Sequence, residues 1–141
     1  MVAAGMVPLS VGTDNGGSIR IPAALCGIVG LKPTFGRVSV DGIFPRAYTF
    51  DHAGPLTRSV ADAAIALQVL AGHDRGNETT IRKPVLDYVT LLANRPEKPR
   101  IGVDRQFGGF GHAAVLDRVE KAVKTLQQPG GVHRRGHNTG G

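Results

Sequence analysis

The 141-residue chain has no tryptophan, a single cysteine and no apolar run approaching the roughly 18 residues of a membrane span. Because Cys26 has no second thiol in the chain to pair with, a disulfide-stabilised scaffold is excluded. No basic residues precede the first apolar stretch, so we expect no signal peptide. These absences predict a cytoplasmic protein that does not act in a membrane.

Aromatic and acidic residues are also scarce, and this bears on nucleic-acid binding. Aromatics make up 5% of the chain, and 11 acidic residues face 17 basic ones, which gives a formal net charge of +6. The basic residues in the middle of the chain alternate with acidic ones, and no aromatics lie among them to stack on bases. We therefore expect a mixed solvated surface and no nucleic-acid partner.

Glycine is plentiful, with 20 residues, while hydrophobic residues still account for 41% of the chain. That apolar content is enough for a core, so the chain is not disordered throughout. Strand and helix signals alternate along it, which favours an α/β fold. Strands are predicted at residues 7–11 and 100–103, and helices at 59–70, 86–93 and 113–128.

The helix that starts after Ser59 has the clearest end signals. Ser59 is a good N-cap, Asp62 occupies the capping-box position, and Gly72 follows the last apolar position. Residues 1–5 resemble the last turn of another helix, with Gly5 just past its end. We expect turns, loops or irregular backbone at residues 12–20, 21–40 and 41–58, where glycine and proline recur.

The final segment, residues 129–141, differs from the rest. It holds five glycines and one apolar residue, Val132, where an α/β protein would place a further strand. We expect a folded part over residues 1–128 and a disordered tail over 129–141. A frameshift in the underlying gene is our hypothesis for the change of character after Gln128.

The stretch that points to chemistry is Asn15-Gly16-Gly17-Ser18. Two glycines before a serine leave its hydroxyl accessible, and such a backbone can direct consecutive N–H groups at one point, as a developing oxyanion requires. On these four residues alone, a plain tight turn is the competing interpretation, because short glycine-rich motifs are weak evidence.

The longer stretches at residues 12–39 and 50–62 are more specific. They read GTDNGGSIRIPAALCGIVGLKPTFGRVS and FDHAGPLTRSVAD, and both closely resemble the amidase signature family of serine hydrolases. The resemblance implies part of a mixed β-sheet core flanked by helices, so the chain is predicted to be an internal, incomplete piece of that fold. It also implies hydrolysis of a carbon–nitrogen bond in a small amide substrate through an acyl-serine intermediate, without cofactor.

The resemblance assigns roles residue by residue. Ser18 aligns with the nucleophile, and the backbone N–H groups of Asn15, Gly16, Gly17 and Ser18 align with the oxyanion hole. In the family a second serine, on a cis peptide, and a lysine activate the nucleophile, and both precede the matched region. We therefore expect this chain to be inactive alone. The A subunit of the tRNA-dependent amidotransferase shares the signature and is one alternative; a catalytically dead remnant is another. The oligomeric state is left open.

Other candidate residues have simpler interpretations. Lys32 lies in a structural stretch of the family, and His52 is expected to be a loop or packing residue, although Asp51-His52 suggests a triad with Ser18. Arg20 is expected to form an ion pair with Asp14 or Asp62.

The remaining candidate residues are expected to pack in the core or to have no role in binding a metal. Cys26 is interpreted as a small buried hydrophobe. Phe35, Ile43 and Phe44 are expected to pack in the core rather than line a pocket. The histidines lack a ligand spacing, so no metal site is predicted.

These expectations make one prediction about the gene. The DNA just upstream of the Met1 codon should encode a Gly-Ser-rich loop and, further back, a lysine. Sequencing that DNA checks it; an unrelated upstream gene would contradict the predicted origin of the chain.

Overall fold

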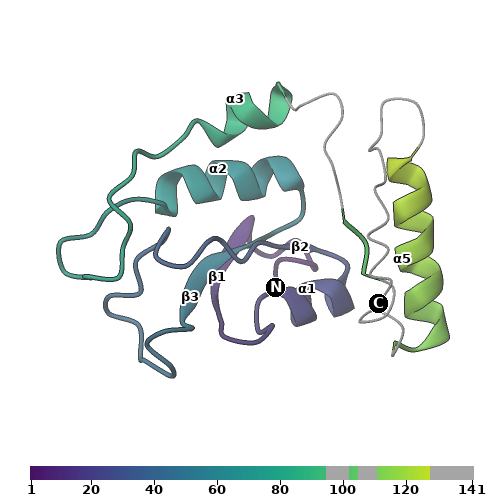
Figure 1. The fold of residues 1–141 in the computed structure, drawn as a ribbon, viewed down its shortest axis with the longest axis horizontal. Coiled ribbons are helices and arrows are strands. Elements are labelled where there is room, and N and C mark those ends of the chain that lie inside the picture. Colours follow the sequence, from purple (N-terminus) through teal and green to yellow (C-terminus); the bar gives the residue numbers. More distant parts are fainter. Residues whose placement is uncertain (95–101, 105–110, 128–141) are drawn as a thin grey trace, which may run out of the picture. The chain divides into compact units, whose positions relative to one another are not determined.

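The computed structural model describes residues 1–94, 102–104 and 111–127 (Figure 1). The chain divides into two compact units, Met1–Asn94 and Arg95–Gly141, which are described separately. The first unit contains β1 (Leu9–Asp14), α1 (Arg20–Cys26), β2 (Val29–Gly30), β3 (His52–Thr57), α2 (Val60–Leu70) and α3 (Tyr88–Ala93), and the second contains α5 (Ala113–Leu126).

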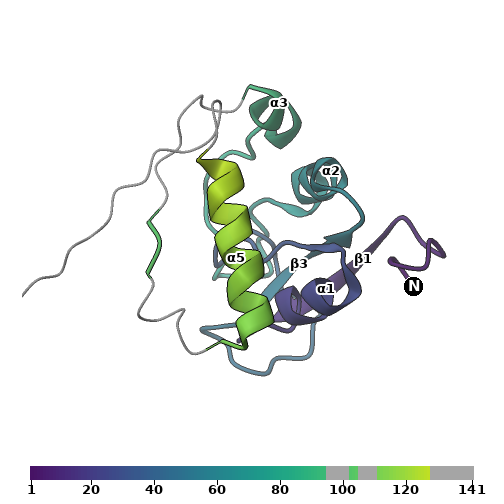
Figure 2. The same cartoon turned by 90° about the vertical axis from the view of Figure 1, so that its right-hand side faces the viewer.

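The first unit is built on a three-stranded sheet in the order β1-β3-β2. Both pairings are antiparallel, with Val11 opposite Pro55 and Val29 opposite Thr57. In the two views, α2 lies between the sheet and α3, and α1 lies beside β2 (Figures 1 and 2). The predicted α/β class is therefore confirmed, and every strand pair in the described residues is antiparallel.

The central strand β3 was expected to be a loop, and that prediction is wrong. Gly54-Pro55 was interpreted as a break, yet Pro55 is fully buried in the middle of the sheet. Its carbonyl accepts a hydrogen bond from the Leu31 N–H at 3.0 Å, on the side of β2. Because β2 ends at Gly30, the proline lies where that ladder stops and its missing N–H costs little.

The strand predicted at residues 7–11 exists, but it is shifted and exposed. β1 runs from Leu9 to Asp14, and only Asp14 is buried; Leu9 and Val11 are 43% and 49% exposed. Among the described elements β1 packs mainly against β3, and no helix covers the faces from which its side chains project.

Helix α1 lies in a region expected to be irregular. With seven residues it is too short for a repeating apolar face, and Ala23 is its one buried residue. Cys26, at its end, is exposed, so the prediction of a buried thiol is wrong.

The start of the chain and the start of α2 follow the predictions. Gly5, at φ +73°, donates to the Val2 carbonyl, and Met6 donates to the Met1 carbonyl. This pair of bonds is the Schellman motif that ends a helix. Ser59 Oγ accepts from the Asp62 N–H at 3.0 Å, which confirms the predicted N-cap. The C-cap is Ala71, so Gly72 lies just past the end of the helix, as predicted.

The core of the unit lies between β3 and α2, around Val38, Ala53 and Leu67. Arg37 connects the segment before α3, and the first residue of α3, to this core through side-chain hydrogen bonds. The buried Arg37 guanidinium donates to the carbonyls of Lys83 and Pro84 and to the Tyr88 hydroxyl, at 3.2, 2.8 and 2.7 Å.

The second unit is described through α5, which confirms the predicted amphipathic helix with a slightly earlier end. Its His112 side chain accepts from the Ala114 N–H, and Lys121 pairs with Asp117 at 2.7 Å. Residues 102–104 are not in a strand, whereas 100 and 101 of the predicted strand, and the tail 129–141, lie outside the described residues.

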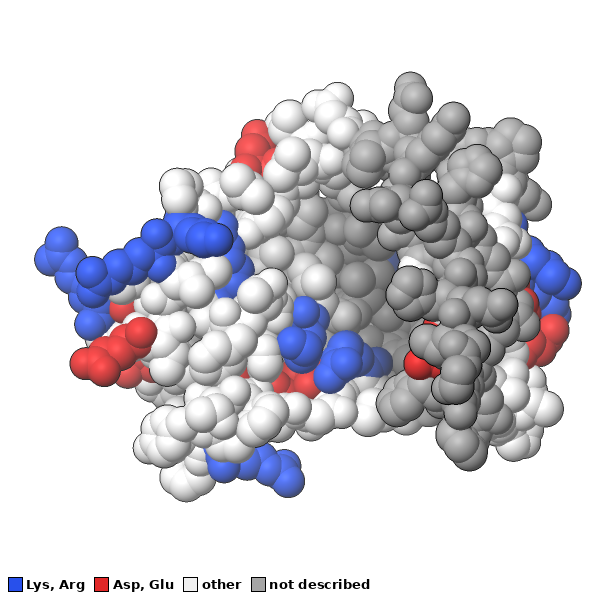
Figure 3. Space-filling model, viewed as in Figure 1, with Lys and Arg blue, Asp and Glu red and all other residues white. Residues whose placement is uncertain are grey.

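The surface carries charges of both signs. On the face in Figure 3, lysine and arginine side chains lie in separate groups with acidic side chains beside several of them. Among the described residues no helix has the length and hydropathy needed to cross a membrane.

The segment after β2 yields a stability prediction. Gly36 has φ +71°, and a Cβ there would lie 2.2 Å from the Thr79 carbonyl oxygen; Gly42 has φ +75° but nothing within 4 Å. Both alanine variants incur the backbone penalty of about 1 kcal/mol, but Gly36→Ala should lose a further ~2 kcal/mol because Thr79 must move. Urea unfolding followed by circular dichroism measures both; equal losses would contradict the packing at Gly36.

Candidate functional site

The loop Asn15–Ser18 connects the end of β1 to the start of α1. Ser18 is exposed, and its hydroxyl has no hydrogen-bond partner in the part of the chain that the structure describes. The next residue, Ile19, is fully buried and anchors the loop to the core. The Ser18 side chain is therefore exposed to solvent, while the buried Ile19 next to it holds the loop in place.

The Asp14 carboxylate holds this loop in place through hydrogen bonds from backbone N–H groups. It is fully buried and accepts from the backbone N–H groups of Gly17, Ile19 and Arg20 at 2.7, 3.2 and 3.4 Å. The Arg20 side chain adds two bonds, from Nε and Nη2, both at 3.0 Å. Of the two partners expected for Arg20, Asp14 is the one observed.

These contacts explain the charge state of Asp14. The Arg20 guanidinium, through its hydrogen bonds, holds the pKa of the carboxyl far below its ordinary value, although burial opposes this. The ionised carboxylate is thus the form that the fold stabilises at neutral pH. The Asp14 carboxylate is buried and the Arg20 side chain is half exposed, and a bidentate pair of this type fixes geometry as well as charge.

The four predicted oxyanion-hole donors are not equivalent. The Gly17 N–H is engaged by Asp14 in this structure. Within the described residues, the N–H groups of Asn15, Gly16 and Ser18 have no acceptor. A Cβ on Gly16 would meet nothing within 4 Å, so the space beside it is open.

Neither Lys32 nor His52 is bonded to Ser18. Lys32 donates to the Pro33 carbonyl at 3.2 Å. The His52 ring packs edge-on against Phe35, with centroids 5.5 Å apart, and its Nδ1 lies 2.6 Å from the Phe50 carbonyl. The packing role expected for His52 is observed, and the described residues place no general base against the serine.

Asp51 is the polar residue that the sequence reasoning missed. It was considered only as a neighbour of His52, yet its buried carboxylate accepts from the Asn15 side chain at 2.6 Å. A signal did exist, because Asp51 belongs to the second family-like stretch, at residues 50–62. Spacing could not reveal the pairing, since 36 positions separate the two residues.

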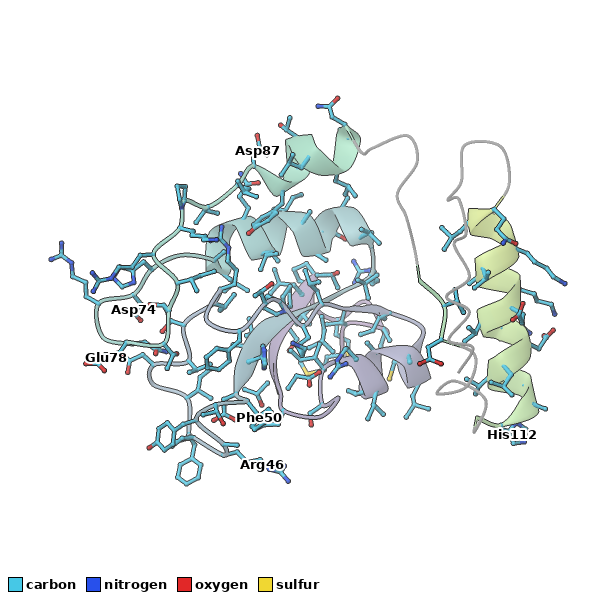
Figure 4. The ribbon with its side chains drawn as sticks, in the orientation of Figure 1. Arg46, Phe50, Asp74, Glu78, Asp87 and His112 are labelled. Atoms are coloured by element: carbon cyan, nitrogen blue, oxygen red, sulfur yellow. The ribbon has the colours of Figure 1, made fainter. Side chains whose placement is uncertain are left out.

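The loop before β3 also corrects the expectation for the apolar candidates. Phe44 is 92% exposed, so its predicted packing is wrong, whereas Ile43 packs against the core and Phe35 against His52. Figure 4 places Arg46 and Phe50 on this loop and Asp74 and Glu78 on the loop after α2. An open cavity of about 230 Å³ lies between the two loops, lined by Ile43, Tyr48, Asp51 and Glu78 among others.

Three comparisons place the chain among known proteins. A family model described as Amidase matches residues 1–135. The chain belongs to the amidase family. The match extends beyond Gln128, the residue at which the sequence was expected to leave the family. Among the described residues no group of histidine, cysteine or carboxylate side chains is arranged to hold a metal ion.

Curated relatives share nearly half of their aligned residues with this chain. The glutamyl-tRNA(Gln) amidotransferase A subunit is 46% identical over 130 residues in Coxiella burnetii and 47% identical over 132 residues in Acinetobacter baumannii. Each alignment covers 92% of this chain and 27% of the relative. The chain thus spans about a quarter of the length of these relatives.

Solved structures of the family share the fold. The glutamyl-tRNA(Gln) amidotransferase A subunit from Thermotoga maritima is 36% identical with a TM-score of 0.86, covering 96% of this chain and 30% of that one. A bacterial aryl acylamidase of the amidase signature enzymes is 36% identical with a TM-score of 0.81, covering 96% and 28%. Both support the predicted amidase signature architecture.

The Asp14–Arg20 pair can be tested by acid unfolding. Because the pKa of Asp14 is depressed in the folded chain, its stabilisation is present above the ordinary carboxyl pKa and is lost as the pH falls. Arg20→Ala removes the main cause, so it should lower the stability of the folded chain at pH 7 and move acid unfolding to higher pH.

The matched control is Arg75→Ala in the same unit, since Arg75 is exposed and its side chain has no hydrogen bond or ion pair within the described residues. Circular dichroism from pH 7 to pH 2 measures the transition. Identical midpoints in the two variants would show that Asp14 does not depend on Arg20.

Proposed function

We propose that Ser18 is the nucleophile of an amide hydrolase. The observation that carries the proposal is an exposed serine next to open backbone N–H groups, on a loop fixed by a buried carboxylate, in a chain of the amidase family. Membership supports hydrolysis of carbon–nitrogen bonds in general, and the loop supports Ser18 as the attacking group.

The proposed reaction has two halves. The Ser18 oxygen attacks the amide carbonyl, and the resulting oxyanion accepts hydrogen bonds from the N–H groups of Asn15, Gly16 and Ser18. The carbon–nitrogen bond then breaks, the amine leaves with a proton, and an ester on Ser18 remains. Water hydrolyses this ester to a carboxylic acid and restores the serine. Gly17, the fourth predicted donor, contributes only if its bond to Asp14 opens.

The proposal extends to what the chain does alone. A serine hydroxyl needs a base to become a strong nucleophile, and the second serine and the lysine implied by the family resemblance are not among these 141 residues. We expect turnover of small amides by this chain to be no faster than that of its Ser18→Ala variant. The proposed route uses no cofactor.

Identity to curated relatives favours a second candidate. The curated relatives at 46–47% identity are named amidotransferase A subunits, while the solved amidotransferase A subunit and the aryl acylamidase are each 36% identical. In that case the acyl-serine chemistry would be the same, but the released nitrogen would be transferred instead of lost to water. A catalytically dead remnant is the third possibility, and it predicts no special reactivity at Ser18.

A fluorophosphonate probe separates a reactive Ser18, which the first two candidates share, from a catalytically dead remnant. Bound to a serine, it carries an oxygen that the open N–H groups would stabilise, so Ser18 should be labelled about 10-fold or more faster than an ordinary serine even without a base. Ser10, which is exposed on β1, is the internal control. Peptide mass spectrometry of the wild type, Ser18→Ala and Ser10→Ala chains measures both sites; equal labelling of Ser10 and Ser18 would contradict the proposal.

A further inference from the structure

The loop before Ser18 is held at its other end by a contact that the proposed mechanism does not use. The Asn15 side-chain amide donates to Asp51 Oδ1 at 2.6 Å, and Asp51 is 8% exposed. Asp51 is the residue just before β3, whereas Asn15 follows β1. The contact therefore joins the ends of two paired strands beside the candidate nucleophile.

Asp51 is itself firmly placed. Its two oxygens accept from the Arg46 N–H at 3.0 Å and from the Ala47 N–H at 3.0 and 3.2 Å, and its own N–H donates to the Ala47 carbonyl. Burial alone would raise the pKa of Asp51, but the hydrogen bonds from Asn15, Ala47 and Arg46 outweigh it and leave the pKa below its ordinary value. The carboxylate is thus ionised at neutral pH.

The part of the loop that this contact restrains has few other restraints. Asp14 holds Gly17, Ile19 and Arg20, but none of its hydrogen bonds reaches Asn15 or Gly16. Gly16 has no side chain to pack, and its surroundings are open. Glycine backbone has more conformational freedom than any other, so donors here would not stay aligned unaided. Oxyanion donors are effective only when they are oriented in advance.

We propose that Asp51 is a positioning residue: by holding the Asn15 side chain, it sets the direction of the backbone N–H groups of Asn15 and Gly16 beside Ser18. Its structural part stands on the contacts alone, and its catalytic consequence rests on the proposed function. Asp14 and Asp51 then clamp the loop from its two ends, one through backbone N–H groups and the other through a side chain.

Nuclear magnetic resonance of the complete 15N-labelled chain tests the positioning. Asn15→Ala keeps the backbone N–H but removes the contact, while Asp51 keeps its bonds to Arg46 and Ala47. The amide chemical shifts of Gly16 and Ser18 should change and their backbone order parameters should fall, whereas those of Arg46 and Ala47 should stay unchanged. Asp51→Asn places an NH₂ group among the N–H donors that surround this position. It should change the amide shifts of both sets, that is, of Gly16 and Ser18 and of Arg46 and Ala47.

Two controls separate positioning from general destabilisation. Asp74→Asn removes a carboxylate that also accepts from a side chain and a backbone N–H, those of Ser39 and Gly76, and it should move neither set. The protected amides of α2 report whether each variant is folded. Unchanged Gly16 and Ser18 signals in folded Asn15→Ala would overturn the proposal.

A pH titration adds a readout that a purely structural role would not produce. In the wild type, the chemical shift of the Gly16 amide should change with pH as the Asp51 carboxyl is protonated. In Asn15→Ala the Gly16 shift should no longer follow that protonation, whereas the shift of the Ala47 amide still should. The signals of the other charged or titratable groups around Asp51 are recorded alongside: Arg46 on its loop, His52 next to it, Asp41 and Glu78 at the cavity, and Asp14 beyond Asn15. A Gly16 signal that is insensitive to Asp51 would overturn the proposal.

Labelling of Ser18 distinguishes failure of the positioning from failure of the proposed function. If Ser18 reacts with the fluorophosphonate, Asn15→Ala should slow it by about 10-fold, as expected for the loss of one charge-assisted hydrogen bond. An unchanged rate would overturn the positioning role. A wild type that does not react would contradict the nucleophile assignment, while the resonance data would still decide the clamp.

Discussion

The buried Asp14 carboxylate is the interaction on which the rest of the first unit depends. It ends β1, caps the turn before α1 through three backbone N–H groups, and pairs with Arg20 on the first turn of that helix. A buried charge is tolerated only with such complete hydrogen bonding. Its pKa is depressed accordingly, so the loop geometry at neutral pH is built around a negative charge that removal of Arg20 would leave without its strongest partner.

The hydrogen bonds of the Asp14 carboxylate engage one of the four predicted oxyanion-hole donors and leave the other three. Asp14 accepts from the Gly17 N–H, whereas those of Asn15, Gly16 and Ser18 have no acceptor within the described residues. Asp51 supplies the second fixed point through Asn15. Gly16 and Ser18 are exposed, so water can bond to their N–H groups and a negative oxygen can replace that water during a reaction; this supports an oxyanion site beside the serine.

The sequence predicted those features that depend on local chemistry. The Ser59 cap, the Schellman turn at Gly5, the amphipathic α5 and the Arg20 ion pair all follow from residues close together in the chain. Features set by tertiary context were missed. Pro55 in the central strand is acceptable only because β2 stops beside it, and the Asp51–Asn15 contact joins residues that no spacing rule connects. The family resemblance supplied the proposed role of Ser18, because four residues alone could not distinguish a nucleophile loop from a tight turn.

The central claim is that the loop before Ser18 is an oxyanion site already formed in the folded chain. A crystal structure of the chain with a phosphonate bound covalently to Ser18 tests it most directly. The account predicts a phosphonyl oxygen about 2.7–3.1 Å from at least two of the N–H groups of Asn15, Gly16 and Ser18, with the Gly17–Asp14 bond intact. An oxygen directed into solvent, or a loop that has rearranged away from Asp14, would contradict it.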